Sequence, residues 1–348
     1  MSHPRVASVL FSALLLLSGC GGGGGGDGGS SPPPTQGGGG TTPPPVTPTA
    51  AVGSLWHSDT DIGDTQGTFV TRLDTGASTR VLAEKWAVPS ADGSRLLRRA
   101  YTSQGSTGDE TRITVNRASD GQLLTDLVVD GYAGDLTPSP LNADQVMAPW
   151  APSINGQRNT VVYDLAQRKL LYATQAAAKP DALSWLPDGA VLRVTAAGEI
   201  SKLVPGGQEQ RLGAAAWPEA RTLQAVYASP DGAKALVQLA ALRPTGTVSG
   251  VDLWMMNVDG SGMRRFTKND LIANALWSQD GKHVAFTKDT GINCTEATCQ
   301  GSCSVWYAEA GASDVVAVAA SQDAKQFAVK RLNGSDKTLN CPVMAWTR

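Results

Sequence analysis

The sequence predicts an all-β fold, a six-bladed β-propeller, and three observations support this prediction. A short phrase built around Asp-Gly recurs six times, counting two degenerate copies, at steps of 43 to 52 residues. The segments that flank these turns alternate in polarity or are rich in β-branched residues, as strands are. Apolar stripes of helical period are hard to find. Units of this length and even spacing favour propeller blades over the alternative, an irregular β-sandwich.

Composition excludes several functional classes. The chain has 348 residues, 29 basic and 31 acidic, for a net charge of −2, and 41% of its residues are hydrophobic. Such a chain is neither disordered as a whole nor suited to polyanions, so we expect no nucleic-acid partner. Only three histidines are present, which leaves few ways to build a histidine-based catalytic or metal site.

The N-terminus has the features of a bacterial export signal. Arg5 precedes an apolar run from Val6 to Leu17, which is too short to span a bilayer as a helix, so residues 1–19 are predicted to be a signal peptide. The ending Leu17-Ser18-Gly19-Cys20 resembles the lipobox of bacterial lipoproteins. The resemblance implies that Cys20 carries diacylglycerol and an amide-linked acyl chain such as palmitate. An ordinary secretory leader is the alternative. In bacterial lipoproteins an Asp directly after the lipidated cysteine implies retention in the inner membrane. This position is Gly21 here, so the resemblance favours the outer membrane.

A linker is predicted between the lipidated cysteine and the folded domain. From Gly21 to Thr49 the chain is almost entirely Gly, Pro, Ser and Thr, with too little apolar surface to offset the entropy of ordering. About 30 residues of such a coil span roughly 30 Å. We therefore divide the chain into a signal peptide (1–19), Cys20 with its disordered linker (20–52) and a propeller domain (53–348).

The repeated phrase marks the turn between two strands of each predicted blade. Asp-Gly between apolar runs is a strong hairpin signal, because Gly accepts a positive φ and Asp bonds to nearby backbone. We therefore assign the turn aspartates a structural role rather than membership of an acidic site. The aspartates are Asp92, Asp188, Asp231, Asp280 and Asp323, with a weak copy at Asp144.

Two segments carry a family resemblance. Ser229-Pro230-Asp231-Gly232 before an apolar strand, and Asp252–Gly262 followed by Arg264-Arg265-Phe266-Thr267, resemble the TolB-type propeller repeat. The resemblance covers roughly residues 86 to 331. The α/β domain that precedes the propeller in TolB is not visible here, so the partners of TolB are not transferred.

Ring closure is predicted to use both chain ends. Residues 68–73 and 79–82 look like the outer half of a blade, and 315–320 with 326–330 look like an inner half, so joining them completes a sixth blade. Residues 54–57 and 343–346 also look like strands. They leave a seventh blade open as the alternative.

Four cysteines remain after Cys20, namely Cys294, Cys299, Cys303 and Cys341. An even number in an exported protein predicts two disulfides. Of the three possible pairings we favour Cys294–Cys299 with Cys303–Cys341, because the second would fasten the C-terminal strand, a loop closure worth ~3–4 kcal/mol. A zinc site is the alternative, although the spacing is not that of a zinc ribbon.

Candidate catalytic groups are few, and we assign none. The sequence has no G-x-S-x-G motif. His57 begins the stretch His57–Asp64, which fails the EF-hand template, so we predict no metal site there. His283 is expected to face solvent. Trp86, Trp185 and Trp277 are expected to pack between blades.

Together these features predict a non-enzymatic module of the bacterial envelope. We expect a monomeric lipoprotein, anchored in the outer membrane through Cys20 on the periplasmic side, with a cell-surface position left open. It would bind an envelope protein or a cell-wall partner without a cofactor. The alternatives are a propeller lyase or hydrolase with a carboxylate or metal site at the channel mouth, and a surface lipoprotein without a single partner.

Overall fold

The computed structural model describes residues 49–59, 62–63, 66–105, 108–153, 156–175, 181–218, 221–242, 248–268, 271–294, 299–340 and 343–348. The side chains of residues 102–108 and 290–302 are outside this description. The predicted signal peptide, Cys20 and the linker up to residue 48 also lie outside it. All regular elements of the described part are strands, so the predicted all-β class is confirmed.

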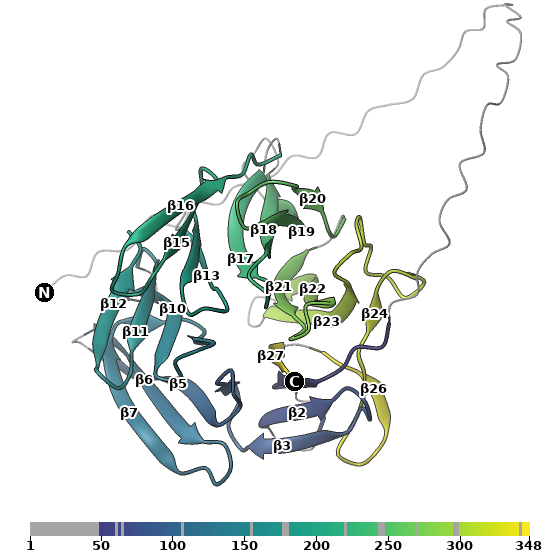
Figure 1. Ribbon diagram of the computed structural model, residues 1–348. Coiled ribbons are helices and arrows are strands. Elements are labelled where there is room, and N and C mark those ends of the chain that lie inside the picture. Colours follow the sequence, from purple (N-terminus) through teal and green to yellow (C-terminus); the bar gives the residue numbers. More distant parts are fainter. Residues whose placement is uncertain are drawn as a thin grey trace, which may run out of the picture. The chain divides into compact units, whose positions relative to one another are not determined.

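Six antiparallel sheets form the blades of a propeller, as predicted (Figure 1). Blade 2 comprises β4 (Val88–Pro89), β5 (Arg95–Gly105), β6 (Gly108–Arg117) and β7 (Leu123–Asp130). Blade 3 comprises β8 (Tyr132–Ala133), β9 (Thr137–Pro138), β10 (Gln145–Ala151), β11 (Asn159–Asp164) and β12 (Lys169–Ala173). Blade 4 comprises β13 (Ala182–Trp185), β14 (Val191–Val194), β15 (Glu199–Leu203) and β16 (Glu209–Ala214). Blade 5 comprises β17 (Arg221–Ala228), β18 (Lys234–Leu242), β19 (Val248–Asn257) and β20 (Arg264–Arg265). Blade 6 comprises β21 (Ile272–Trp277), β22 (His283–Cys294), β23 (Cys299–Glu309) and β24 (Lys325–Gln326).

Blade 1 closes the ring with strands from both chain ends. Its order is β27 (Val343–Thr347), β1 (Ser54–His57), β2 (Thr68–Arg72) and β3 (Ser78–Leu82). Closure from both ends was predicted, but the predicted inner half was wrong. The strands left over for a seventh blade are the true inner half, paired from Ser54 opposite Thr347 onward. Residues 325–326 instead finish blade 6, and β25 (Ala328–Lys330) pairs with β26 (Asp336–Thr338) as a separate hairpin.

The Asp-Gly turns lie along one end of the ring and touch one another. A methyl group built on Gly232 would approach Pro187 at 3.1 Å, and one on Gly189 would approach Leu141 at 3.5 Å, so these two turns each rest on the preceding blade's turn. At the seam, Gln279 donates a hydrogen bond to the carbonyl of Trp346 at 3.1 Å. The connections between the first and second strands of a blade, and between its third and fourth strands, lie at this end of the ring. We call this end the turn face and the opposite end the loop face.

Large apolar side chains fill the wedges between blades. Trp185 and Trp277 are buried, and each donates its indole N–H to a carbonyl of the preceding blade, on Thr137 and Tyr227. Both therefore pack between blades as predicted. Trp86 does not, because half of its side chain is exposed. His283 was expected at the surface but is buried, packed edge-on to Tyr307.

Candidate functional site

The chain enters the propeller on the turn face. The Thr49 N–H donates to Glu309 Oε1 at 2.8 Å, and its hydroxyl lies 3.0 Å from His283 Nε2. His283 begins β22, directly after the Asp280 turn. The Trp346 indole then binds the carbonyl of Val52 at 2.8 Å. These contacts cover His283, which explains why it is buried.

The turn aspartates bond to their own turns. Asp231 Oδ1 accepts hydrogen bonds from the Ser229 hydroxyl at 2.5 Å and from the Ala233 N–H at 3.0 Å. These hydrogen bonds lower the pKa of Asp231, and the bond from the Ser229 hydroxyl has the largest effect. Backbone amides are bound in the same way by Asp92, Asp188 and Asp280. Asp323 differs, since its own N–H donates to the Ser321 hydroxyl at 3.2 Å.

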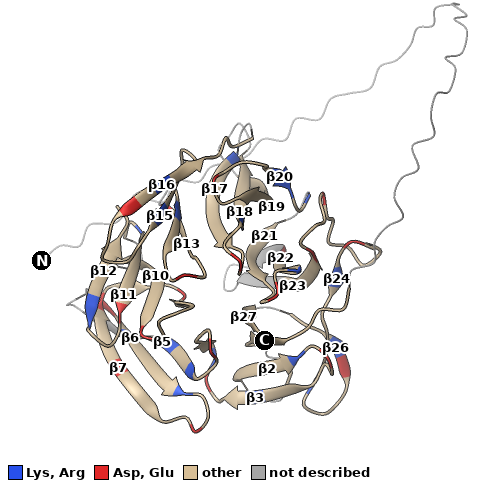
Figure 2. Ribbon diagram, viewed as in Figure 1, with Lys and Arg blue, Asp and Glu red and all other residues tan. Residues whose placement is uncertain are grey.

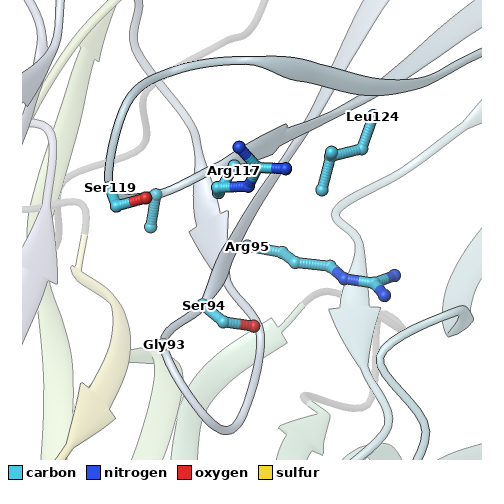
Figure 3. A pocket seen from close by; sticks show the side chains of 7 residues that line it. Gly93, Ser94, Arg95, Arg117, Ser119 and Leu124 are labelled. Atoms are coloured by element: carbon cyan, nitrogen blue, oxygen red, sulfur yellow. The ribbon is translucent and has the colours of Figure 1, made fainter.

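A shallow cavity of about 660 Å³ opens between two turns of blade 2 (Figure 3). Arg95 and Arg117 line it, together with Ser94, Ser119 and Leu124. Both guanidinium groups are already paired with carboxylates, Arg95 with Asp144 and Arg117 with Asp120. The cavity therefore offers little free positive charge to an anion.

The stretch around His57 forms a buried network at the seam. His57 Nε2 lies 2.8 Å from Thr71 Oγ1, which in turn lies 2.7 Å from Ser78 Oγ. Asp59 accepts hydrogen bonds from Lys337 Nζ at 2.6 Å and from the Asn340 N–H at 2.9 Å. Burial lowers the pKa of His57 to about 4, so the ring is neutral at pH 7. Asp61 and Asp64, the other acids of the stretch His57–Asp64, lie outside the described residues.

The pairing of the strands gives evidence on which cysteines could form disulfides with one another. Cys294 and Cys299 are directly opposite one another in the β22–β23 ladder. Ser304 and Asn340 form an antiparallel bridge. Cys303 is the residue before Ser304, and Cys341 is the residue after Asn340. Cys303 is not a free thiol. Cys341 and the side chains of Cys294 and Cys299 lie outside the described part, so the pairing remains a prediction.

The loop face of blades 2 and 3 carries an aromatic cluster that the sequence did not reveal. The rings of Tyr101, in the second half of β5, and Tyr132, on β8, stack with centroids 4.6 Å apart and an angle of 10°. Gly131 makes this possible, because its φ is +95° and a methyl group there would meet the Trp150 ring at 2.7 Å. Tyr101 is 44% exposed. Burial of its hydroxyl is the main cause that raises the pKa of Tyr101, and its hydrogen bond to Tyr132 is the second. The phenol therefore stays protonated.

Two arginines and an acid flank the stacked rings. Arg99 lies over the Tyr101 ring, 5.3 Å from its centroid, and Arg158 lies 5.8 Å from the centroid of Tyr132. Arg99 also donates to Asp135 Oδ1 at 2.6 Å. Cation–π contacts of this kind hold guanidinium and ring together at an exposed site.

Trp86 lies on the other side of blade 2, where blade 2 meets blade 1. It lies in the loop before β4, whose residue Val88 pairs with Leu97 of β5. Glu84 of this loop forms an ion pair with Arg98 at 3.2 Å. Arg98 and Arg99 are successive residues of β5, so their side chains point to opposite faces of the sheet. Trp86 has a φ of +68°, a conformation costly for any residue with a Cβ, and its N–H donates to Ser58 Oγ at 3.0 Å. We call Arg99, Tyr101, Tyr132, Asp135 and Arg158 the loop-face aromatic surface.

Basic and acidic residues are interspersed along the described parts of the blades (Figure 2). In the described residues, no group of three or more His, Cys, Asp or Glu side chains is placed to hold a metal ion. The same part of the chain contains no helix with the length and apolarity that a membrane crossing needs.

Neither the family models nor the curated proteins give a match to this sequence. Among solved structures, the chain is similar to a protein described as TolB from Agrobacterium tumefaciens, with 17% identity, a TM-score of 0.47, and 76% of this chain and 88% of that one covered. It is similar to a protein described as a 6-phosphogluconolactonase from Bacteroides uniformis, with 16% identity, a TM-score of 0.46 and coverages of 77% and 82%. It is also similar to an oligogalacturonate lyase in complex with manganese, with 9% identity, a TM-score of 0.41 and coverages of 79% and 70%. Similarities this distant carry no inference about activity or partner.

Proposed function

We propose that this protein is a non-enzymatic binding module of the bacterial cell envelope, anchored through Cys20 to the periplasmic side of the outer membrane. Its partner, an envelope protein or a cell-wall component, is held on the loop-face aromatic surface. The observation that carries the proposal is the exposed tyrosine stack flanked by two arginines. Tyr, Trp and Arg are the residues that most often dominate binding energy at recognition surfaces.

The described polar groups with catalytic potential have structural partners instead. His57 and Asp59 are buried in the seam network, and four of the turn aspartates bind their own backbone. Loops on a rigid scaffold, by contrast, are where recognition residues concentrate. The geometry therefore supports binding better than the alternative, a lyase or hydrolase.

Anchoring is supported by the leader motif that ends at Cys20. Replacing Cys20 with Ser removes the thiol that would receive the lipid, so Cys20→Ser should move the protein from the membrane fraction to the soluble fraction. Membrane association that is unchanged in this variant would contradict the anchor.

Partner binding is tested in cells. A photo-crosslinking residue at Tyr101 should capture a partner that the same residue at Leu170, an exposed position on β12, does not capture. Mass spectrometry of the products identifies the partner. Equal labelling from both positions, or none from Tyr101, would count against a binding role for the loop face.

A further inference from the structure

We propose that the outer edge of blade 2 binds a partner polypeptide by strand addition, and that the added strand is extended and basic. The site is strand β7 (Leu123–Asp130), which lies on the outside of the ring (Figure 1). The inference adds a second surface to the proposed function. It follows from three properties of β7, which are its outward-facing backbone groups, its lack of edge protection and its acidic charge.

β7 is the last strand of its sheet, and in the described part of the chain it pairs only with β6. The register shifts at Leu124 but is regular from Thr125 to Asp130. At the end of the strand, the carbonyl of Asp130 accepts a hydrogen bond from the Trp150 indole at 2.8 Å. The regular part before Asp130 is therefore the edge that another strand could use.

The backbone direction along this edge follows from one hydrogen bond. The Gly131 N–H donates to the carbonyl of Asp109 on β6 at 2.6 Å. Backbone groups alternate in direction along an antiparallel strand, so every second residue before Gly131 faces β6. The N–H and C=O groups of Asp126 and Val128, at the positions between, face away from the sheet. They form a template to which an extended peptide can add its own backbone hydrogen bonds.

β7 lacks the protection that the other outer strands have. Natural sheets guard their edges with short edge strands and with charged side chains, Lys above all. The outermost strands of the other five blades have two to six residues, and each contains Lys or Arg. β7 has eight residues, five of them apolar, and neither Lys nor Arg. Leu124 and Val128 are 41% and 50% exposed, so this edge is the one best suited to accept another strand.

Charge favours a basic partner strand. Asp126 and Asp130 are the charged residues of β7, and residues 108–130 contain five acidic and two basic residues. Both basic residues, Arg112 and Arg117, are already paired with carboxylates of the same segment. Lys or Arg at alternate positions of an added strand would face the two aspartates, and an apolar residue between them would lie beside Val128.

A second copy of this chain fits the edge less well. Antiparallel pairing of two β7 strands about Val128 would place Asp126 of each copy opposite Asp130 of the other. Like charges directly opposite one another destabilise a strand pair. The partner is therefore a different polypeptide.

The test is titration of the full chain into a fluorescently labelled peptide in which Lys and Val alternate, KVKVKVK, followed by fluorescence anisotropy. Two control peptides separate the causes of binding. KVKPKVK keeps the charge but carries a central Pro, which cannot donate to a ladder, and EVEVEVE reverses the charge. Each should bind more weakly than KVKVKVK by about tenfold or more. Bound KVKVKVK should also slow hydrogen exchange at the amides of Asp126 and Val128.

Val128→Lys copies the protection of the other outer strands, so it should weaken the binding of KVKVKVK by about tenfold or more. Leu170→Lys is the matched control, because Leu170 is 51% exposed on β12, the outer strand of blade 3. Its affinity for the peptide should stay within about twofold of the wild type.

No binding of KVKVKVK, equal affinity for KVKPKVK, unchanged exchange at Val128, or equal effects of the two variants would overturn the inference. Self-association that Val128→Lys abolishes, without peptide binding, would assign the edge to a second copy and would overturn it as well. Crosslinking at Tyr101 tests the loop face and is independent of these outcomes.

Discussion

Lys337 donates a hydrogen bond to Asp59 Oδ2 at 2.6 Å, and the two residues are 278 positions apart in the sequence. Their side chains are only 6% and 3% exposed. Lys337 lies on β26, and Asp59 lies two residues after the end of β1, the second strand of blade 1. The ion pair therefore joins the C-terminal hairpin to the N-terminal part of the blade that closes the ring.

Breaking this pair should be costly. Lys337→Met leaves the Asp59 carboxylate buried without its cation, so we expect a loss of about 3–5 kcal/mol in the free energy of unfolding. Adding Asp59→Asn should restore part of it, since the uncompensated charge is then gone. The control is Arg112→Gln, which breaks an exposed pair with Asp126 and should cost about 1 kcal/mol or less. Urea unfolding measures all three. Equal effects of Lys337→Met and Arg112→Gln would show that the buried pair has no special role.

Stability should fall in mild acid because of His57. The pKa of His57 is lowered to about 4 in the folded state from 6.5, mainly by burial. Above pH 6.5 the ring is neutral in both states. As the pH falls from 6.5 to 4, the unfolded chain binds a proton that the folded chain does not, so the free energy of unfolding decreases by up to about 3 kcal/mol. His57→Gln should flatten this part of the profile. A wild-type profile that is level between pH 6.5 and 4.5 would contradict the assignment.

The turn aspartates should matter for stability and little for binding. Asp231→Ala removes the acceptor for Ser229 and for the Ala233 N–H, so we expect a loss of about 1 kcal/mol. In a Ser229→Ala background the loss should be smaller, because one of these bonds is already missing. Thermal unfolding of the four proteins gives the coupling. A strong loss of ligand affinity in folded Asp231→Ala would instead assign the carboxylate to a site.

Strain at Trp86 can be measured separately from the loss of its ring. Trp86→Gly and Trp86→Ala remove the same side chain, but only glycine adopts a φ of +68° without penalty. The glycine variant should therefore be more stable than the alanine variant by about 1 kcal/mol. Arg168 also has a positive φ, of 54°, so Arg168→Gly and Arg168→Ala should differ in the same direction. If alanine is as stable as glycine at position 86, the loop is not strained.

All four cysteines beyond Cys20 should be oxidised. In a Cys20→Ser variant, thiol titration after denaturation without reductant should find no free thiol, and peptide mapping should give Cys294–Cys299 and Cys303–Cys341. The opposed positions of Cys294 and Cys299 and the Ser304–Asn340 bridge motivate this pairing. Four free thiols would remove the predicted fastening of the C-terminal strand.

The sequence predicted those features that depend on neighbouring residues. The turn at Asp231-Gly232 is one, because its hydrogen bonds lie within a few residues and Gly232 adopts a φ of +70°. The number of blades followed from the spacing of such turns. Blade identity at the seam was not predicted correctly, because the pairing of Ser54 with Thr347 joins distant segments and neither strand carries a local sign of its partner.

The loop-face aromatic surface could not be predicted for the same reason. Tyr101 and Tyr132 come from different blades, and nothing near either residue indicates the stack. The positive φ of Trp86 is imposed by its loop rather than by its residue type, so its strand-like neighbours predicted burial.

The attachment of Thr49 to His283 and Glu309 has a mechanical consequence. A force on the chain that precedes Thr49 would act through these contacts on blade 6 and blade 1 before it acted on blades 2 and 3. The side of the ring that carries this force also holds blade 1, where strands from both parts of the chain pair.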